Sequence, residues 1–325
     1  MSERESRRRR LYVYIGLAVF ALLVVAPFFL RGYWVRVLTN MFMFAILAES
    51  VNIIAGYCGY LALGNMLFFG MGSYIVAVLM VKLGLPFFPA FIAAGLGSCV
   101  FSVLVGLPIL RLKSQYFLTG TVGLMKLLEE IVRNITFTGG GQGLTLPIFP
   151  GGPQAANIFF YFCMFGLMMA VVGATLFISK SHLGYAFLSI KSDEQAASVM
   201  GINPTPYKTI AWAISALFTG MTGGLYAYWM SYIDPVEAFQ IAPSIKMYLM
   251  MTLGGSATVI GPVLGAFFVE FISELVWGRF LEIHFLILGL ILVLVVIFAP
   301  KGLIGFVGKR FKLSDYLKGI RQNRV

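Results

Sequence analysis

PFFPAFIAAGLGSCVFSVLVGLPIL, the stretch at residues 86–110, runs for 25 residues without a charged side chain. A helix rises about 1.5 Å per residue, so roughly 20 apolar residues cross the hydrocarbon core of a bilayer. This stretch is therefore long enough and apolar enough to span a membrane. Similar runs recur along the chain and give ten candidate spans, two of them short: 11–30, 34–54, 60–81, 86–110, 115–134, 157–178, 209–231, 244–255, 260–277 and 282–299.

The overall composition agrees with a membrane location. Apolar residues make up 59% of the chain and charged residues only 11%, whereas about 25% charged residues is usual for soluble domains. A soluble surface needs more polar side chains than this chain has. We therefore predict an all-α polytopic membrane protein with about ten transmembrane or partly spanning helices, broken at glycine-rich turns. The three cysteines have no metal-binding or redox spacing, and we predict no metal site and no catalytic residue.

The basic residues predict how the chain is oriented in the membrane. If both termini are cytoplasmic, 17 of the 24 Lys and Arg residues lie on the cytoplasmic side, which fits the positive-inside rule. The net charge of +11 thus indicates topology and contact with lipid, and we expect no binding to nucleic acid. We predict one transmembrane domain at 11–299 between basic cytoplasmic tails at 1–10 and 300–325. Within it, residues 135–156 form an external loop and 179–208 a cytoplasmic loop.

Several charged residues fall at membrane depth. The span at 115–134 contains two basic and two acidic residues, which predicts a central helix whose charges pair at i,i+3 and i,i+4 spacing. Glu49, Glu270 and Glu274 are further intramembrane carboxylates, and the sequence places no basic partner near them. They could serve a proton relay, but solvated packing is the simpler interpretation for the last two.

Two glycine-rich stretches, 56–65 and 254–262, interrupt the apolar pattern. Broken helices are tolerated at membrane depth only where the backbone is buried in protein or lines a cavity. The alternative for the first stretch is a tight turn between packed helices. The candidate residues of the translocation path and broken helices are Gly56, Gly59, Gly64, Asn65, Gly254, Gly255, Gly261 and Pro262.

The cytoplasmic loop predicts a short helix of its own. Ser192 and Gln195 have the spacing of a capping box, and Gly201 is a typical stop signal. Its alanine residues suit close contact with another surface. The helix could therefore receive a partner protein, or it could simply connect two spans along the membrane.

Six short motifs follow one another along the chain: Gly56-Tyr57-x-Gly59-Tyr60-Leu61-x-Leu63-Gly64, Phe68-Phe69-Gly70-Met71-Gly72-Ser73-Tyr74, Thr138-Gly139-Gly140-x-x-Gly143, Asp193-Glu194-x-Ala196-Ala197-x-x-x-Gly201-Ile202, Leu253-Gly254-Gly255-x-x-x-x-x-Gly261-Pro262-x-x-Gly265-Ala266 and Ala299-Pro300-Lys301-Gly302-Leu303. In this order they resemble the permease subunit of bacterial branched-chain amino-acid ABC importers. The resemblance extends from about residue 34 to 306.

The resemblance implies a multi-pass protein of the bacterial inner membrane that works with a second permease subunit, two cytoplasmic ABC ATPase subunits and an external solute-binding protein. ATP and magnesium would bind to the ATPase subunits, because this chain carries no phosphate-binding loop and is not expected to be an enzyme. The short cytoplasmic helix would be the coupling helix that docks on an ATPase. Its implied contact residues are Asp193, Glu194, Gln195, Ala196, Ala197 and Gly201. The chain departs from the general loop pattern in having Gln195 at the glutamate position.

Three alternatives remain open from the sequence. An ion-coupled secondary transporter would explain the broken helices and the membrane carboxylates, but it gives no reason for a capped cytoplasmic helix. A passive channel would need a ring of pore-lining groups, which the sequence does not specify. An ABC permease for urea or short amides would share the predicted architecture.

Overall fold

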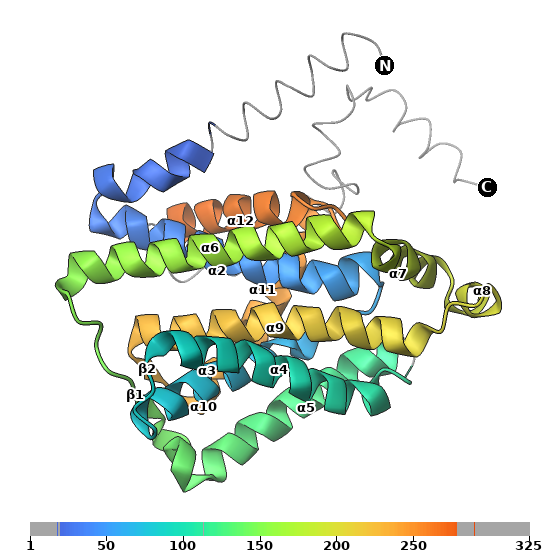
Figure 1. Cartoon of the computed structure of the whole chain (residues 1–325), viewed down its shortest axis with the longest axis horizontal. Coiled ribbons are helices and arrows are strands. Elements are labelled where there is room, and N and C mark those ends of the chain that lie inside the picture. Colours follow the sequence, from blue (N-terminus) through green and yellow to red (C-terminus); the bar gives the residue numbers. More distant parts are fainter. Residues whose placement is uncertain (1–17, 19, 113, 278–288, 290–325) are drawn as a thin grey trace.

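The computed structural model describes residues 20–112 and 114–277, together with the single residues 18 and 289 (Figure 1). The predicted span at 282–299 and both basic tails lie outside the described residues, and the span at 11–30 is described only as a helix at Phe20–Phe29. Strand is limited, within the described residues, to one two-residue pair. The prediction of an all-α polytopic membrane protein is confirmed.

The described elements follow in this order: α2 Gly32–Val51, a π-helix Asn52–Tyr57, a 3-10 turn Leu63–Asn65, α3 Met66–Val81, α4 Phe87–Ile109, α5 Ser114–Asn134, 3-10 turns Thr136–Thr138 and Gly140–Gln142, β1 Leu144–Thr145, α6 Gly152–Lys180, α7 His182–Ser192, α8 Glu194–Val199, α9 Pro204–Met230, β2 Tyr232–Ile233, α10 Pro235–Ala238, α11 Ile241–Gly254 and α12 Gly261–Trp277.

Five of the described segments are long and apolar enough to cross a membrane: Gly32–Tyr57, Leu63–Val81, Phe87–Ile109, Gly152–Lys180 and Pro204–Met230. The first and last of these are mostly buried inside the chain, whereas α4 and α6 expose much of their apolar surface. The exposed apolar faces are suited to contact with lipid or with another membrane helix. The helices α11 and α12, with 14 and 17 residues, are shorter.

Two groups of helices form the core. The helix α9 packs against α3 and α4, and α2 packs against α6 and α12. The backbones of α3 and α9 touch at Gly72 and Gly220. If Gly72 had a side chain, its Cβ atom would lie only 2.0 Å from the carbonyl oxygen of Gly220. Small residues allow this close approach in place of a hydrophobic driving force, which is weak between helices in lipid.

The helix α5 lies at the edge of the chain and not at its centre (Figure 1). Phe117, Thr121 and Met125 form its buried stripe, while Lys126 and Glu129 make an i,i+3 ion pair of 2.6 Å outside that stripe. The predicted i,i+3 pairing is thus confirmed for Lys126 and Glu129, but the predicted central position is wrong for this chain alone. A helix with one buried stripe packs on one side and leaves the other side open.

The two ends of the helix bundle differ. At one end β1 and β2 pair antiparallel, with Leu144 opposite Ile233, and at the other end α7 and α8 project from the bundle (Figure 1). The predicted loop 135–156 is therefore partly ordered by strand pairing, and α6 already begins at Gly152. The predicted loop 179–208 contains two helices, of which the sequence analysis predicted only α8.

Candidate functional site

The helix α8 begins at a side-chain cap. The backbone of Asp193 is extended, and its Oδ1 accepts hydrogen bonds from the backbone N–H groups of Gln195 at 2.9 Å and Ala196 at 3.0 Å. The prediction that Ser192 is the cap is wrong, because α7 continues through Ser192, whose hydroxyl donates to the carbonyl of Leu188. A cap needs non-helical backbone, and Asp193 is where the chain leaves the helical conformation.

The helix ends at Val199, and Gly201 stops it two residues later, as predicted. This glycine has a φ of +89°, which a residue with a side chain rarely adopts, and its N–H donates to the carbonyl of Ser198. The next residue, Ile202, returns a hydrogen bond to the carbonyl of Ala197. This closing pattern satisfies the last carbonyl groups of the helix.

The exposed surface of α8 differs from the predicted alanine face. Ala197 is buried against the chain itself, and only Ala196 of the two alanines faces outward. The most exposed apolar side chains are Val199 and Met200, with 87% and 82% of their surface exposed. Neither residue is predicted from the sequence as a contact residue. The signal that could have identified them is local: two apolar residues stand directly before a glycine that stops a helix, in an otherwise polar loop.

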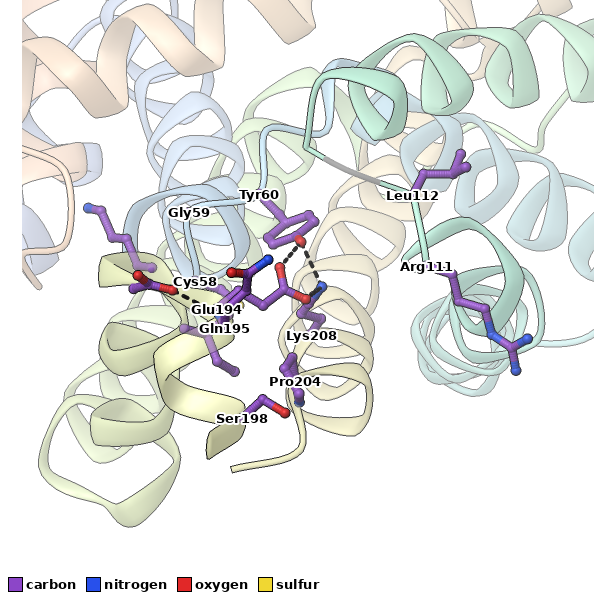
Figure 2. Close-up of a pocket in the computed structure, with 13 residues that line it drawn as sticks. Cys58, Gly59, Tyr60, Arg111, Leu112, Glu194, Gln195, Ser198, Pro204 and Lys208 are labelled. Atoms are coloured by element: carbon purple, nitrogen blue, oxygen red, sulfur yellow. Dashed lines mark hydrogen bonds and ion pairs between the residues drawn. The ribbon is translucent and has the colours of Figure 1, made fainter. Parts of the chain in front are cut away.

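A buried lysine connects α8 to the first glycine-rich stretch (Figure 2). Lys208 donates to the Tyr60 hydroxyl at 2.6 Å and forms an ion pair with Glu194, and the Tyr60 hydroxyl also donates to Glu194. The Lys208 ammonium lies 4.2 Å from the centre of the Tyr60 ring, and only 3% of its side chain is exposed. A buried charge needs a partner of this kind, since an unpaired one is strongly destabilising.

The phenol of Tyr60 remains protonated in this cluster. Burial, and then the neighbouring carboxylate of Glu194, raise the pKa of Tyr60 above its usual range. The hydroxyl can therefore donate to Glu194 while it accepts from Lys208.

A second contact joins α7 to the π-helix. The ammonium of Lys191 donates to the carbonyl oxygen of Gly56 at 2.6 Å. Its side chain also crosses Gly59, where an added Cβ atom would lie 3.0 Å from Lys191 Cγ. Gly59 has a φ of +82°, so both its backbone conformation and this close contact require glycine.

The two glycine-rich stretches meet at Asn52. Its Oδ1 accepts from the N–H of Ala257 at 2.9 Å, and its Nδ2 donates to the carbonyl of Thr258 at 2.8 Å. A Cβ atom on Gly56 would lie 2.9 Å from Ala257 N. The turn between α11 and α12 thus rests directly on the π-helix, and this fully buried Asn52 is a further residue that the sequence analysis missed.

The predicted break at 254–262 is confirmed in the structure. The helix α11 ends at Gly254 and α12 begins at Gly261, with Pro262 next in the chain. A Cβ atom on Gly254 would lie 1.8 Å from the carbonyl oxygen of Gly261. Gly255 has a φ of +123° and Ala257 one of +59°. The turn is therefore tight, and its glycines are buried in protein, as a break at membrane depth requires.

Gly64 and Asn65 are anchored elsewhere on the bundle. The N–H of Gly64 donates to the Thr121 hydroxyl of α5, and the side-chain amide of Asn65 donates to the hydroxyls of Ser215 and Thr219 of α9, each at 3.2 Å. This part of the stretch acts as a tight turn between packed helices, which is one of the two predicted alternatives.

A cavity of about 690 Å³ opens beside the Lys208 cluster (Figure 2). It lies between α7, α8, the start of α9 and the segment after α4, with Arg111 on the side opposite Glu194. Its lining residues are Cys58, Gly59, Tyr60, Arg111, Leu112, Ile190, Lys191, Asp193, Glu194, Gln195, Ser198, Pro204 and Lys208. The cavity and α8 together form the candidate coupling site, called the coupling site below, which comprises these residues with Val199 and Met200.

One intramembrane carboxylate has a basic partner that the sequence analysis missed. Lys246 of α11 forms an ion pair of 2.6 Å with Glu270 of α12, and Glu274 accepts a hydrogen bond from Tyr33. The sequence alone places no basic partner near these carboxylates, and the fold supplies one for Glu270. The hairpin of α11 and α12 brings together two residues that are 24 positions apart in the sequence.

Several curated permease proteins have sequences similar to this chain. The high-affinity branched-chain amino acid transport system permease protein LivM of Salmonella typhimurium is 29% identical over 92% of this chain and 77% of its own length. LivM of Escherichia coli K12 is 28% identical over 92% and 76%, and the permease protein LivH of the same strain is 24% identical over 81% and 91%.

No solved structure is significantly similar to this chain. Residues 33–296 match the family described as branched-chain amino acid transport system / permease component. This match covers the five described spans, apart from the first residue, Gly32. The chain belongs to this family of permease components.

Proposed function

We propose that this chain is one of the transmembrane subunits of an ATP-driven importer that moves branched-chain amino acids into the cytoplasm. The observation that carries the proposal is α8, a capped helix that projects from the bundle with Val199 and Met200 exposed and is tied by Glu194 and Lys208 to the membrane domain. The permease names of the relatives support the same conclusion.

The coupling site offers a path for mechanical work. An ATPase subunit that binds Val199 and Met200 would move α8 when it binds ATP. The ion pair of Glu194 with Lys208 transmits this motion to α9, and the contact of Lys191 with Gly56 transmits it to the π-helix. Through Asn52 the π-helix then moves the turn between α11 and α12. Tilting of these helices opens the pathway alternately to each side.

The assembly follows from this assignment. The end of the bundle with α7 and α8 faces the cytoplasm and the two ATPase subunits, and the end with β1 and β2 faces outward, toward a solute-binding protein. A second permease subunit completes the pathway. Both termini are cytoplasmic, and residues 11–299 form a single transmembrane domain in a bacterial inner membrane. ATP and magnesium bind to the ATPase subunits, and this chain supplies no phosphate-binding loop.

The decisive experiment uses the purified complex in liposomes. The variant Val199→Asp/Met200→Asp changes the exposed tip of the coupling site, and Val236→Asp is the control, since Val236 is an exposed apolar residue of α10 at the opposite end. We expect the double variant to insert normally but to lose ATPase association and with it stimulated ATP hydrolysis, while the control keeps ATPase association. Unchanged transport that follows a proton or sodium gradient would overturn the proposal.

A further inference from the structure

A buried ion pair joins the two helices of the broken hairpin. The Lys246 ammonium lies 2.6 Å from a Glu270 carboxylate oxygen and 4.3 Å from the centre of the Phe44 ring on α2. Only 5% of the Glu270 side chain is exposed, against 23% for Lys246. The pair is thus almost enclosed, but it can be reached from the side of Lys246.

The fold does not need this pair to hold α11 and α12 together. A Cβ atom on Gly265 of α12 would lie 1.9 Å from the carbonyl oxygen of Met250 on α11, so the two backbones already touch. Replacing a buried ion pair by apolar residues is often neutral or stabilising, because the pair loses its hydration when it is buried. Charged residues inside a membrane domain are costly, and they commonly mark a solute or ion pathway.

The chemistry of an amino acid matches this pair. A free amino acid carries a carboxylate and an ammonium group, and each needs an opposite charge when it leaves water. Lys246 offers the positive charge and Glu270 the negative one, and the two side chains lie side by side although they belong to different helices, α11 and α12. Solute sites of transporters are commonly built where helices are interrupted in this way. The pair therefore presents one complementary charge to each end of the zwitterion.

We propose that Lys246 and Glu270 form a recognition site for the α-carboxylate and α-ammonium groups of an aliphatic amino acid. The inference rests on the proposed function and adds the groups that the solute contacts. In the absence of solute the two side chains neutralise each other. When the solute arrives, its carboxylate binds Lys246 and its ammonium binds Glu270, so that two ion pairs replace one. Phe44 retains its contact with the Lys246 ammonium and offers the solute an apolar surface.

The test uses the complete transporter with its second permease, ATPases and binding protein. The variant Lys246→Met/Glu270→Leu removes both charges and leaves neither partner unpaired. Its matched control is Lys126→Met/Glu129→Leu, which removes the 2.6 Å pair on the outer part of α5. We expect leucine uptake by the first variant to fall about 100-fold, since two charge-assisted contacts to the solute are lost. The first variant should still assemble with its partner subunits, and the control should import normally.

A second variant guards against a folding defect. Glu270→Asp keeps both charges but shortens the reach of the carboxylate by one methylene group. We expect it to assemble normally and to raise the concentration of loaded binding protein needed for half-maximal uptake about tenfold, because one solute contact is stretched. The Lys126/Glu129 control should leave this concentration unchanged.

The outcomes separate the inference from the proposed function. Leucine import by the wild-type complex supports the function whatever the variants do. If the wild type imports leucine and the Lys246→Met/Glu270→Leu variant does so equally well, or if Glu270→Asp leaves the half-maximal concentration unchanged, the pair is a structural ion pair and the inference is overturned. If the wild type imports no aliphatic amino acid, the function and this site fall together.

Discussion

Lys191 and Gly56 are joined by a hydrogen bond of 2.6 Å from the lysine ammonium to the glycine carbonyl oxygen. The two residues belong to different helices: Lys191 lies in the last turn of α7, and Gly56 lies in the π-helix that continues α2. Short π-helical segments often occur at functional sites. This bond therefore links the end of the bundle that carries α7 and α8 to an irregular part of the most buried described span.

Removing this link should uncouple the transporter. We expect Lys191→Met to leave ATP hydrolysis within about twofold of the wild type but to lower the solute moved per ATP about tenfold, which corresponds to the loss of one charge-assisted hydrogen bond. Uptake of labelled leucine and release of phosphate, measured in the same liposomes, give this ratio.

The control for Lys191 is Lys180→Met, which removes an exposed lysine at the end of α6. It carries the same charge change on the same side of the molecule. If both variants lower the ratio equally, the effect comes from surface charge and not from the contact with Gly56.

The turn between α11 and α12 should not tolerate a methyl group at Gly254. An added Cβ atom would lie 1.8 Å from the carbonyl oxygen of Gly261, so Gly254→Ala must push the two helices apart. We expect a loss of about 1–3 kcal/mol in stability, as for other overpacked sites, seen as a lower melting temperature in detergent.

Gly166→Ala is the matched control for the turn. Gly166 lies in α6, and an added Cβ atom there would meet no other atom within 4 Å. Alanine favours a helix over glycine by about 1 kcal/mol, so this variant should melt at the same or a higher temperature. Equal destabilisation by both substitutions would show that the close contact at Gly254 is not the cause.

Breaking the ion pair at the coupling site should destabilise the chain. Glu194→Gln leaves the ammonium of Lys208 buried without its counter-charge. We expect a loss of about 2 kcal/mol, below the range for a fully buried pair because Glu194 is partly exposed. Thermal unfolding in detergent measures this loss.

A double variant separates charge from shape in this pair. Glu194→Gln/Lys208→Met leaves no unpaired charge, so it should recover part of the lost stability. If the double variant loses as much stability as Glu194→Gln and Lys208→Met lose together when each is made alone, the ion-pair explanation is contradicted.

The sequence predicts the spans and the breaks well because both depend on local composition. Long apolar runs such as 86–110 become helices, and glycine density marks where α11 ends and α12 begins. The stop of α8 before Gly201 is equally local, because the positive φ of Gly201 favours glycine.

Contacts between distant segments could not be predicted in this way. Lys246 and Glu270, or Asn52 and Ala257, come together only after the hairpin has folded. The cap of α8 was misassigned to Ser192 because the sequence alone gave no sign that α7 extends so far. Ala197 was expected to face a partner, but the packing of α8 against its own chain buries it. The site was therefore only partly predictable: its glycines and its short helix were found, and its polar connections were not.

Cys58 gives a pH-dependent test of the coupling site. It lies in the linker between two spans, is fully buried, and lines the cavity beside Lys208. Burial raises the pKa of its thiol from 9.0 to about 12. A thiol with the ordinary pKa of 9.0 is about one tenth ionised at pH 8, whereas a thiol with a pKa of about 12 is ionised in about one molecule in ten thousand.

The reaction with iodoacetamide should follow this difference. In a protein with Cys99→Ser and Cys163→Ser, Cys58 should react about 1,000-fold more slowly at pH 8 than a cysteine introduced by Ser198→Cys into a protein without the three native cysteines, because only the thiolate reacts. Ser198 is exposed on α8. The rate for Cys58 should still rise about tenfold per pH unit up to pH 11, while that of the control levels off above about pH 9.

The same shift sets the sign of a stability effect. The folded chain favours the neutral thiol, so Cys58 contributes stability that is fully present below the unfolded pKa of 9.0 and is lost as pH rises toward about 12. Cys58→Ala should remove the fall in melting temperature that this thiol causes at high pH. Below pH 8 the melting temperature of the variant should depend on pH as that of the wild type does. A rate for Cys58 that is independent of pH would mean that opening of the site limits the reaction, and one that levels off near pH 9 would mean that the thiol is not enclosed by Tyr60, Glu194 and Lys208.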